Sequence, residues 1–396
     1  MISFKEAEQI VLRNLMDLGK ELVPLENSVG RVLAEKIYAD RDFPPFDRVT
    51  KDGIAIRFQS YENGNKLFKI QETAAAGSAQ VTLSHPNDCI EVMTGAMLPK
   101  GTDTVIMYEN LLLKDGNAIV EIAPQKSQDV HSKGSDEHSG SVLLDSGNLI
   151  TPAEIGVLAT VGKSEVKVKK LPKIAIVSTG DELVNIDEIP EPHQIRKSNS
   201  WSLKAALKSQ GIIGELLHFR DSKEALLEGL GKAIDNYDVL LLSGGVSKGK
   251  FDYLPEVLEK LGVKKLFHRV LQRPGKPFWF GLNDFCTLFA FPGNPASTFA
   301  NFHVYFLPWL RSSFGAQTDR CHAVLNERFE NTTDLTRFIL ADAQLSQGTI
   351  KTNLVKDNGS GDLTSLARSN GLICFDSNRN YEVGELVPFY PTKKIL

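Results

Sequence analysis

The sequence predicts an α/β protein of several domains, with a mostly parallel β-sheet at its centre and β-rich regions around it. The chain has 396 residues, which is more than a single ordinary domain usually contains. From residue 171 to about residue 312, apolar strand-like runs alternate with helical patterns. Short β-rich runs, separated by polar turns, occupy regions before and after this alternating part.

Composition limits the partners and the location of the chain. Hydrophobic residues make up 42% of the sequence and charged residues 24%, as in a globular protein with buried cores. The net charge of −4 argues against nucleic acid or an anionic membrane as the main partner. No apolar run is long enough to cross a bilayer, and charges interrupt the N-terminal segment from Lys5 onward, unlike a signal peptide. We therefore expect a cytoplasmic protein.

The first part of the chain is expected to contain two domains. Residues 1–40 and 139–170 predict one region of helix and strand, and residues 41–138 predict a β-rich domain inserted into it. Ser3 and Glu6 fit a capping box at the start of an N-terminal helix. The inserted region contains strand-like runs such as DGIAIRF and DCIEVM between turns of Gly, Asn and Asp.

Residues 171–317 are expected to form the α/β domain. The predicted strands are KIAIVS, GELLHF, DVLLL and CTLFAF, and the predicted helices are SNSWSLKAALKSQG, DSKEALLEGLGKAI, DYLPEVLEKLG and NPASTFANFHVYFLPWL. Asp221 is expected to cap the second of these helices. Residues 318–396 contain the strand-like runs RFILADAQL, TIKTNLV and ELVPFYPT, which indicate a small β-barrel or a sandwich.

Three of the predicted strands break into turns of small residues. The turns consist of Ser178, Thr179 and Gly180; of Ser243, Gly244 and Gly245; and of Pro292, Gly293, Asn294 and Pro295. Because the carboxyl ends of parallel strands line one edge of a sheet, we expect these turns to converge there. Glycines let the backbone approach a ligand, and the helices that follow offer free N–H groups to an anion. One such turn alone could be a plain connection, but three together favour ligand binding. The dinucleotide and P-loop motifs are missing, which excludes those common sites.

Carboxylates occur at the same predicted edge. Asp181 and Glu182 follow the first turn, Asp221 follows the second strand, and Asp252 follows the Gly-Gly turn. Asp181 and Asp221 could instead merely cap helices. Carboxylates beside a phosphate pocket would repel the ligand unless a hard cation bridged them. These carboxylates therefore predict Mg²⁺ at this edge of the sheet.

Two cations occupy the rigid segment LQRPGKPFWF. Arg273 and Lys276 lie beside prolines that restrict the backbone, so their side chains start from defined positions. A lone lysine is usually a solvated surface charge, but these two are predicted to bind an anion.

Neither the histidines nor the cysteines show the spacing of a metal site. His131 and His138 flank SKGSDE at a separation that fits neither a helical pair nor a zinc finger, so we expect surface histidines. The cysteines are far apart along the chain, which indicates free thiols in a reducing compartment. They are Cys89, Cys286, Cys321 and Cys374.

Eight segments of the sequence are similar to the motifs of a known protein family. In chain order they are FPPFDRVTKDGIAIR, EVMTGAMLPKGTDTVIMYE, KGSDEHSGSVLLDSG, STGDEL, SGGVSKGKFDY, RPGKPFWFG, FPGNPAS and GSGDLTSLARSNGLI. Together they resemble the molybdopterin molybdotransferase (molybdenum insertase) family, which includes the E domain of gephyrin. The likeness covers essentially the whole chain, and eight motifs in one order make it specific.

This resemblance implies a fold, a reaction and partners. The implied fold has a linker domain, a β-rich domain, an α/β molybdopterin-binding domain and a C-terminal β-barrel. The implied protein is a homodimer whose active cleft uses both subunits. The implied reaction joins molybdate to adenylylated molybdopterin, cleaves the pyrophosphate and releases AMP and molybdenum cofactor, with a divalent cation such as Mg²⁺. A molybdopterin adenylyltransferase and apo-molybdoenzymes are implied as further partners.

The resemblance also assigns roles to residues. Asp52, Thr94, Asp136 and Glu182 look like the functional polar residues of the reaction, and Asp221 and Asp252 look like nucleotide and metal contacts. Pro292 and Pro295 are implied to shape the pterin pocket, and Arg337 and Ser360 are implied on the molybdate side.

The chain departs from the family pattern at several positions. His131 stands where an Arg is common, Arg273 where a Lys is common, and Lys197 where an Asp is common. Lys51 replaces the usual Met before Asp52, and its charge is expected to lower the pKa of that carboxyl group. These changes concern contacts with the pterin rather than the fold.

Two other functions are compatible with parts of the sequence. A binding scaffold that has lost catalysis could keep the fold, but it would not need the five acids of the proposed site. These are Asp52, Asp136, Glu182, Asp221 and Asp252. A molybdopterin adenylyltransferase resembles only the α/β domain, so the domains around it argue against that function.

Overall fold

The computed structural model describes residues 1–246, 253–315 and 321–395. The chain divides into two compact units. The first contains Met1–Ala34, Gly147–Thr151 and Glu165–Leu396, and the second contains Glu35–Ser146 and Pro152–Ser164. Each unit has its own core, and each is described by itself.

The first unit is built around a six-stranded, mostly parallel sheet, as the alternating pattern predicted. Four strands run parallel in the order β16, β13, β17 and β21, and β20 and β18 continue the sheet in antiparallel fashion. Their bounds are β13 Ile174–Thr179, β16 Gly214–Phe219, β17 Val239–Ser243, β18 Lys264–His268, β20 Trp279–Leu282 and β21 Thr287–Phe291.

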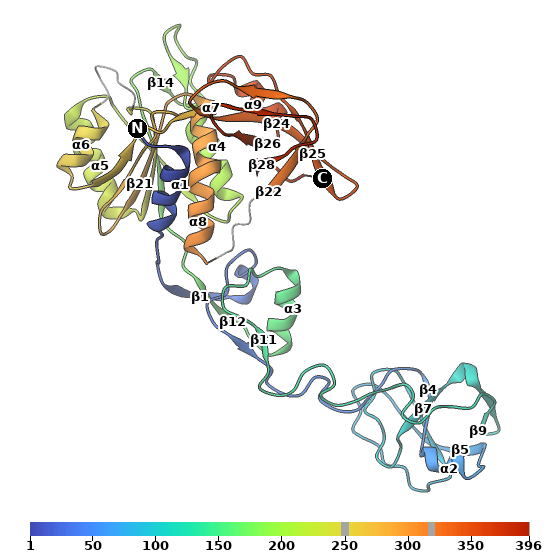
Figure 1. Cartoon of the computed structure of the whole chain (residues 1–396). Helices are drawn as coiled ribbons and strands as arrows, with labels where there is room; N and C mark the ends of the chain where they lie inside the picture. The colour runs from blue at the N-terminus through green and yellow to red at the C-terminus, as the bar shows by residue number, and fades with distance from the viewer. Residues whose placement is uncertain (247–252, 316–320, 396) are drawn as a thin grey trace. The chain divides into compact units, whose positions relative to one another are not determined.

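Helices cover both faces of this sheet (Figure 1). On one face α1, α4 and α8 share a core with Ile174 and Ile176, and on the other α5 and α6 pack against Ala175 and Val177. Every residue of β13 is buried, as expected for a strand between two helical layers. The helices are α1 Phe4–Arg13, α4 Ser198–Lys208, α5 Lys223–Asn236, α6 Leu254–Lys260, α7 Pro295–Asn301 and α8 Leu307–Ser313, with the π-helical turn η3 Phe302–Phe306 between the last two.

Two helix starts test the predicted caps. The capping box of Ser3 and Glu6 is present at α1. The predicted cap of α5 by Asp221 is wrong, because Ser222 is the N-cap and its hydroxyl accepts a hydrogen bond from the Ala225 N–H. Either residue type suits an N-cap, so the sequence alone did not decide between these neighbours.

The last part of the first unit is a closed five-stranded barrel. The ring runs β24, β25, β22, β28 and β26, and it closes because β24 pairs with both β25 and β26. A short strand of the α/β part, β19, adds to β24 in parallel. The bounds are β19 Gln272–Arg273, β22 Cys321–Leu325, β24 Thr336–Ser346, β25 Thr349–Leu354, β26 Gly371–Phe375 and β28 Leu386–Pro391. This closure excludes the sandwich alternative.

The second unit contains a six-stranded sheet in the order β7, β4, β6, β5, β9 and β8. The strands are β4 Gly53–Ile56, β5 Leu67–Ala74, β6 Cys89–Val92, β7 Thr104–Met107, β8 Leu111–Lys114 and β9 Asn117–Val120. Residues of β4 enter two small cores on opposite faces, Ala55 in one and Ile54 with Ile56 in the other. A separate two-stranded ladder pairs β3 Arg48–Val49 with β10 Val130–His131.

Smaller elements complete the described chain. Antiparallel pairs join β1 Lys20–Pro24 to β12 Glu165–Lys169 and β2 Ile37–Tyr38 to β11 Val142–Leu144. The others are α2 Phe58–Glu62, α3 Pro152–Thr160, α9 Leu363–Arg368, β14 Leu183–Val184, β15 Ile195–Arg196, β23 Phe329–Asn331, β27 Arg379–Tyr381 and the 3₁₀ turns η1 Leu25–Asn27 and η2 Tyr108–Asn110.

All four cysteines are free thiols, and three of them are buried. Among the described residues, no helix combines the length and apolar character that crossing a bilayer requires.

Candidate active site

The three small-residue turns lie around one cavity of about 340 Å³ in the first unit. We call it the glycine-edge pocket. It is lined by Ser178, Thr179, Glu182, Leu183, Ile195, Arg196, Lys197, Ser198, Asn199, Ser200, Asp221, Ser243, Gly244, Gly245, Gly293, Asn294 and Pro295. Gly180 and Pro292 belong to the same turns but do not line the cavity, and Asp252 lies outside the described residues.

Close backbone approach holds these turns together. Gly244 has a φ of +106°, and a Cβ added there would lie 2.9 Å from the carbonyl oxygen of Thr179. A Cβ on Gly293 would lie 3.8 Å from the Cα of Gly244. The second turn can therefore touch the first only because it has no side chain at Gly244.

Asn199, in the first turn of α4, ties two of the turns to each other. Its side-chain amide donates to the carbonyl of Gly293 at 2.6 Å and to the hydroxyl of Ser243 at 3.0 Å. Sequence analysis missed this residue. The available signal was its place at the start of a helix that begins at the same sheet edge.

The glycine-edge pocket carries charges of both signs. Glu182 and Asp221 face it with Lys197, whose ammonium donates to the Asn185 side chain at 3.0 Å. Burial, followed by the charge of Lys197, lowers the pKa of nearby His218, so this imidazole is neutral at neutral pH. Asp181 caps no helix, because the short strand β14 follows β13.

The residues of this pocket fit a magnesium ion that a phosphate ligand completes. Within the described ranges, no group of three or more His, Cys, Asp or Glu is arranged to hold a metal. Mg²⁺, however, usually keeps several waters and binds one or two carboxylates together with substrate phosphates. Asp221, which lines this pocket, can supply one such carboxylate.

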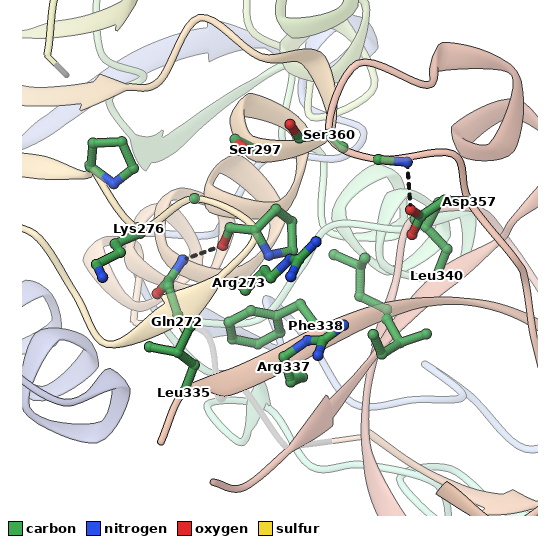
Figure 2. A pocket seen from close by; sticks show the side chains of 17 residues that line it. Gln272, Arg273, Lys276, Ser297, Leu335, Arg337, Phe338, Leu340, Asp357 and Ser360 are labelled. Carbon is green, nitrogen blue, oxygen red and sulfur yellow. Dashed lines mark hydrogen bonds between the residues drawn. The ribbon is translucent and has the colours of Figure 1, made fainter. Parts of the chain in front are cut away.

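A second cavity, of about 300 Å³, lies between the α/β part and the barrel of the same unit (Figure 2). We call it the arginine pocket. Its lining residues are Gln272, Arg273, Pro274, Gly275, Lys276, Pro277, Ala296, Ser297, Leu335, Arg337, Phe338, Ile339, Leu340, Asp357, Gly359, Ser360 and Leu372. Four residues chosen from the sequence therefore share this cavity: Arg273, Lys276, Arg337 and Ser360.

Two guanidinium groups meet at this cavity. Arg273 and Arg337 are register partners in the parallel pair β19–β24. Burial, and then the charge of Arg273, lowers the pKa of Arg337, while Asp357 opposes the shift. An arginine stays protonated regardless, so the pair remains doubly charged. The buried Nε of Arg337 has no hydrogen-bond partner in the described part of the chain. Such an arrangement is stabilised when an anion binds.

A buried polar network supports the loop that carries Arg273 and Lys276. The side-chain amide of Gln272 donates to Asn301 Oδ1 at 2.8 Å and to the Pro274 carbonyl at 3.1 Å, and the Tyr305 hydroxyl donates to Gln272. Gln272 and Asn301 are almost completely buried. A Cβ on Gly275 would lie 2.5 Å from Asn301 Oδ1, so the loop also depends on a glycine there.

One short segment forms the wall between the two pockets. Residues 293–295 line the glycine-edge pocket, and the next two residues, 296–297, line the arginine pocket. Ser360 is bound to this segment, because its hydroxyl accepts from Asn294 at 2.9 Å and its carbonyl accepts from the Ala296 N–H at 3.0 Å. The two cavities are therefore separated by the thickness of a single turn.

The second unit holds the other predicted polar residues. Asp52 Oδ1 accepts from the N–H of Thr94 at 2.6 Å and from its hydroxyl at 2.7 Å. These bonds, the backbone one first, lower the pKa of Asp52. The expected contribution of Lys51 is wrong, since Thr94 and not Lys51 accounts for the shift.

Asp136 does not join this pair but contacts His131, at 2.7 Å from Nε2 to Oδ1. His131 was expected to be a plain surface histidine. Instead its side chain is only 30% exposed, and both ring nitrogens are in hydrogen bonds, the second with Arg48. The spacing of the histidines gave no indication of this contact.

Comparisons with known proteins cover nearly the whole chain. Residues 2–162 match the MoeA N-terminal region (domain I and II), residues 175–312 a "Probable molybdopterin binding domain", and residues 322–392 the MoeA C-terminal region (domain IV). A Synechocystis protein named molybdopterin molybdenumtransferase is 39% identical over 398 residues, which is 98% of this chain and 100% of that protein.

The chain belongs to the MoeA family. A molybdopterin molybdenumtransferase of Staphylococcus aureus, another similar protein, is 31% identical over 99% of this chain and 96% of its own length. The crystal structure of the molybdopterin biosynthesis moeA protein of Pyrococcus horikoshii OT3 is similar with a TM-score of 0.83 and 28% identity, and covers 98% of this chain and 99% of that one. The MoeA fold is thus shared along the entire chain.

The Asp52–Thr94 contact of this MoeA-family protein yields a prediction. In Thr94→Val the hydroxyl is lost and the backbone N–H remains, so the pKa of Asp52 should rise part of the way to its ordinary value. Thr94→Ser is the matched control and should leave the pKa low. Titration of the carboxyl carbon by NMR measures both. A carboxyl group whose pKa is lowered in the folded protein stabilises the fold at pH values above its pKa in the unfolded state. Any loss of stability in Thr94→Val should therefore appear at neutral pH and vanish in acid. An unchanged pKa in Thr94→Val would contradict the role of the hydroxyl.

Proposed function

We propose that this protein is a molybdopterin molybdenumtransferase, which inserts molybdenum into molybdopterin during molybdenum cofactor biosynthesis. The relatives from Synechocystis and Staphylococcus aureus carry that name. The observation that carries the proposal is the pair of adjacent pockets, one suited to a phosphate-containing ligand and the other to an oxyanion, with one turn between them. The transfer of molybdenum from one substrate to another requires that the two substrates bind close together.

Adenylylated molybdopterin is the proposed ligand of the glycine-edge pocket. Ser178, Thr179, Ser243, Gly244 and Gly245 present hydroxyl and backbone groups at the ends of two parallel strands, where diphosphate groups bind in such sheets. In the same proposal, Pro295 lines the wall next to the pterin, and Pro292 restricts the backbone of the same turn. Lys197 offsets part of the ligand's negative charge.

Molybdate is the proposed occupant of the arginine pocket, as a substrate. A tetrahedral dianion there would accept hydrogen bonds from Arg273 and Arg337, relieve their mutual repulsion and supply a partner for the Arg337 Nε. Lys276 and the Ser360 hydroxyl line the same cavity and would contribute further donors. Phe338 and the leucines of the lining exclude water, which strengthens these charge interactions.

Mg²⁺ is proposed at Asp221, with Asp252 as the second carboxylate. When bound, the ion would neutralise the diphosphate and favour the departure of AMP. Glu182 faces the same cavity and would orient water or the ion. Asp52, whose lowered pKa keeps it ionised, would accept a hydrogen bond in the same reaction.

Release of AMP tests the proposal directly. The full chain, incubated with adenylylated molybdopterin, molybdate and Mg²⁺, should release AMP and form cofactor that activates an apo-molybdoenzyme. EDTA should suppress the release. If the ligand binds but no AMP appears under any metal condition, the protein is a binding scaffold and the proposed activity is wrong.

The arginine pair gives a sharper expectation. Arg273→Met removes a like charge next to Arg337, so the protein without oxyanion should keep or slightly raise its melting temperature, while the stabilisation by added molybdate should shrink. Lys276→Ala should raise the KM for molybdate about tenfold, the effect of one lost charged hydrogen bond. Lys265→Ala, an exposed lysine on β18, is the control and should change neither quantity. Lower stability with unchanged molybdate binding in Arg273→Met would mark the pair as structural.

We further propose a homodimer in which each site takes residues from both chains, with a molybdopterin adenylyltransferase as supplier of the substrate. Asp52→Asn and Glu182→Gln should each be nearly inactive alone. Random re-association makes about half of the dimers mixed, and each mixed dimer has one intact site, so roughly a quarter of the wild-type activity should return. The controls are the two variants dissociated and re-associated separately. A mixture as inactive as the controls, with mixed dimers verified by mass spectrometry, would rule out shared sites.

A further inference from the structure

Three charged or polar side chains of the second unit form a linear chain of hydrogen bonds. Arg48 Nη2 lies 3.0 Å from His131 Nδ1, and His131 Nε2 lies 2.7 Å from Asp136 Oδ1. Arg48 and His131 are directly opposite each other in the antiparallel pair β3–β10. The strand register therefore holds the first two members together.

The chemistry of the guanidinium group determines the state of the imidazole. An arginine side chain has only donors, so His131 Nδ1 must accept the hydrogen bond from Arg48. The ring proton then resides on Nε2, which is the nitrogen that faces the Asp136 carboxylate. Arg48 thus selects the one tautomer of His131 that donates to Asp136.

The backbone around Asp136 is already fixed by other bonds. The N–H of Asp136 donates to the Phe43 carbonyl at 2.9 Å, and the N–H of Gly134 donates to the Pro44 carbonyl at 2.9 Å. The N–H of Lys133 donates to Asp47 Oδ1 at 2.8 Å. Since the loop is held in this way, the freedom that remains is rotation of the Asp136 side chain, which is 55% exposed. The imidazole restricts that rotation.

We propose that Arg48 and His131 are positioning residues: Arg48 sets the tautomer of His131, and His131 in that tautomer orients the carboxylate of Asp136. The inference rests on the proposed function only in taking Asp136 as a residue of the reaction. The hydrogen-bond chain itself has a readout that does not depend on activity.

That readout is the protonation of the two ring nitrogens of His131 in the full chain. Histidine is labelled with ¹⁵N, and the His131 signals are assigned by their loss in His131→Gln. In the wild type, we expect a proton on Nε2 and none on Nδ1. In Arg48→Met, the two tautomers should mix, whereas Arg57→Met, which removes an exposed arginine of the same unit, should leave the signals unchanged. A proton on Nδ1 in the wild type, or unaltered signals in Arg48→Met, would overturn the proposal.

Kinetic measurements then show whether the hydrogen bonds from Arg48 through His131 to Asp136 affect the reaction rate. Arg48→Met and His131→Leu should each slow AMP release about fivefold, and the double variant should lose no more than His131→Leu alone, because both act through one carboxylate. His131→Gln should recover most of the rate, since its amide both accepts from Arg48 and donates to Asp136. If the rate losses of the two single variants add up in the double variant, Arg48 and His131 do not act through one chain of hydrogen bonds. Full activity in Asp136→Asn would refute the assigned role of Asp136 in the proposed function, while leaving the tautomer result intact.

Discussion

The parallel register of β13, β17 and β21 is the constraint on which the first unit depends. Ser178 pairs with Ser243, and Ser243 pairs with Phe291, so the three strands end at the same level. The turns that follow the strands therefore lie side by side. Because Gly244 has no side chain, its backbone can approach that of the first turn. The glycine-edge pocket is a direct consequence of this register. The two residues that follow the third turn, Ala296 and Ser297, line the arginine pocket, so that cavity also depends on where β21 ends.

Polar groups in the core give the arginine pocket its shape at an energetic cost. Gln272, Asn301 and Tyr305 are buried, and their side chains form hydrogen bonds with one another and with loop carbonyls. Burial of such groups without partners would be unfavourable, so the network specifies one conformation of the loop. An apolar core of the same volume would also stabilise the fold. It would not, however, fix the position of the loop backbone from which the Arg273 side chain extends.

Charge is distributed unevenly across the thin wall between the pockets. Two acids, Glu182 and Asp221, and two bases, Arg196 and Lys197, line the glycine-edge pocket. The arginine pocket instead has three bases, Arg273, Lys276 and Arg337, against the single acid Asp357. Like charges gathered in partly buried positions destabilise a protein that has no ligand. Burial, and after it the charge of Arg273, lowers the pKa of Arg337. Sites that bind charged substrates commonly carry this strain, because the substrate itself supplies the missing charge.

The sequence by itself determined the types of element, several of their bounds and the edge at which the site lies. Buried strands such as β13 and β17 are mainly apolar runs, and small-residue turns end them, so a local pattern was sufficient. Right-handed crossovers then require the turns to share an edge. The resemblance to the family indicated Arg337 and Ser360, which no local pattern marks.

Only the tertiary structure decided which side chains are partners. The closure of the barrel requires β24 to pair with β26, and the arginine pair requires β19 to lie beside β24. Arg48 and His131 are likewise far apart in sequence and meet only through the register of β3 and β10. A hydrogen bond or an ion pair depends on positions to within a fraction of an ångström, whereas hydrophobic periodicity specifies only which face is buried. The sequence therefore did not determine the pairing between distant strands, which only the tertiary structure shows.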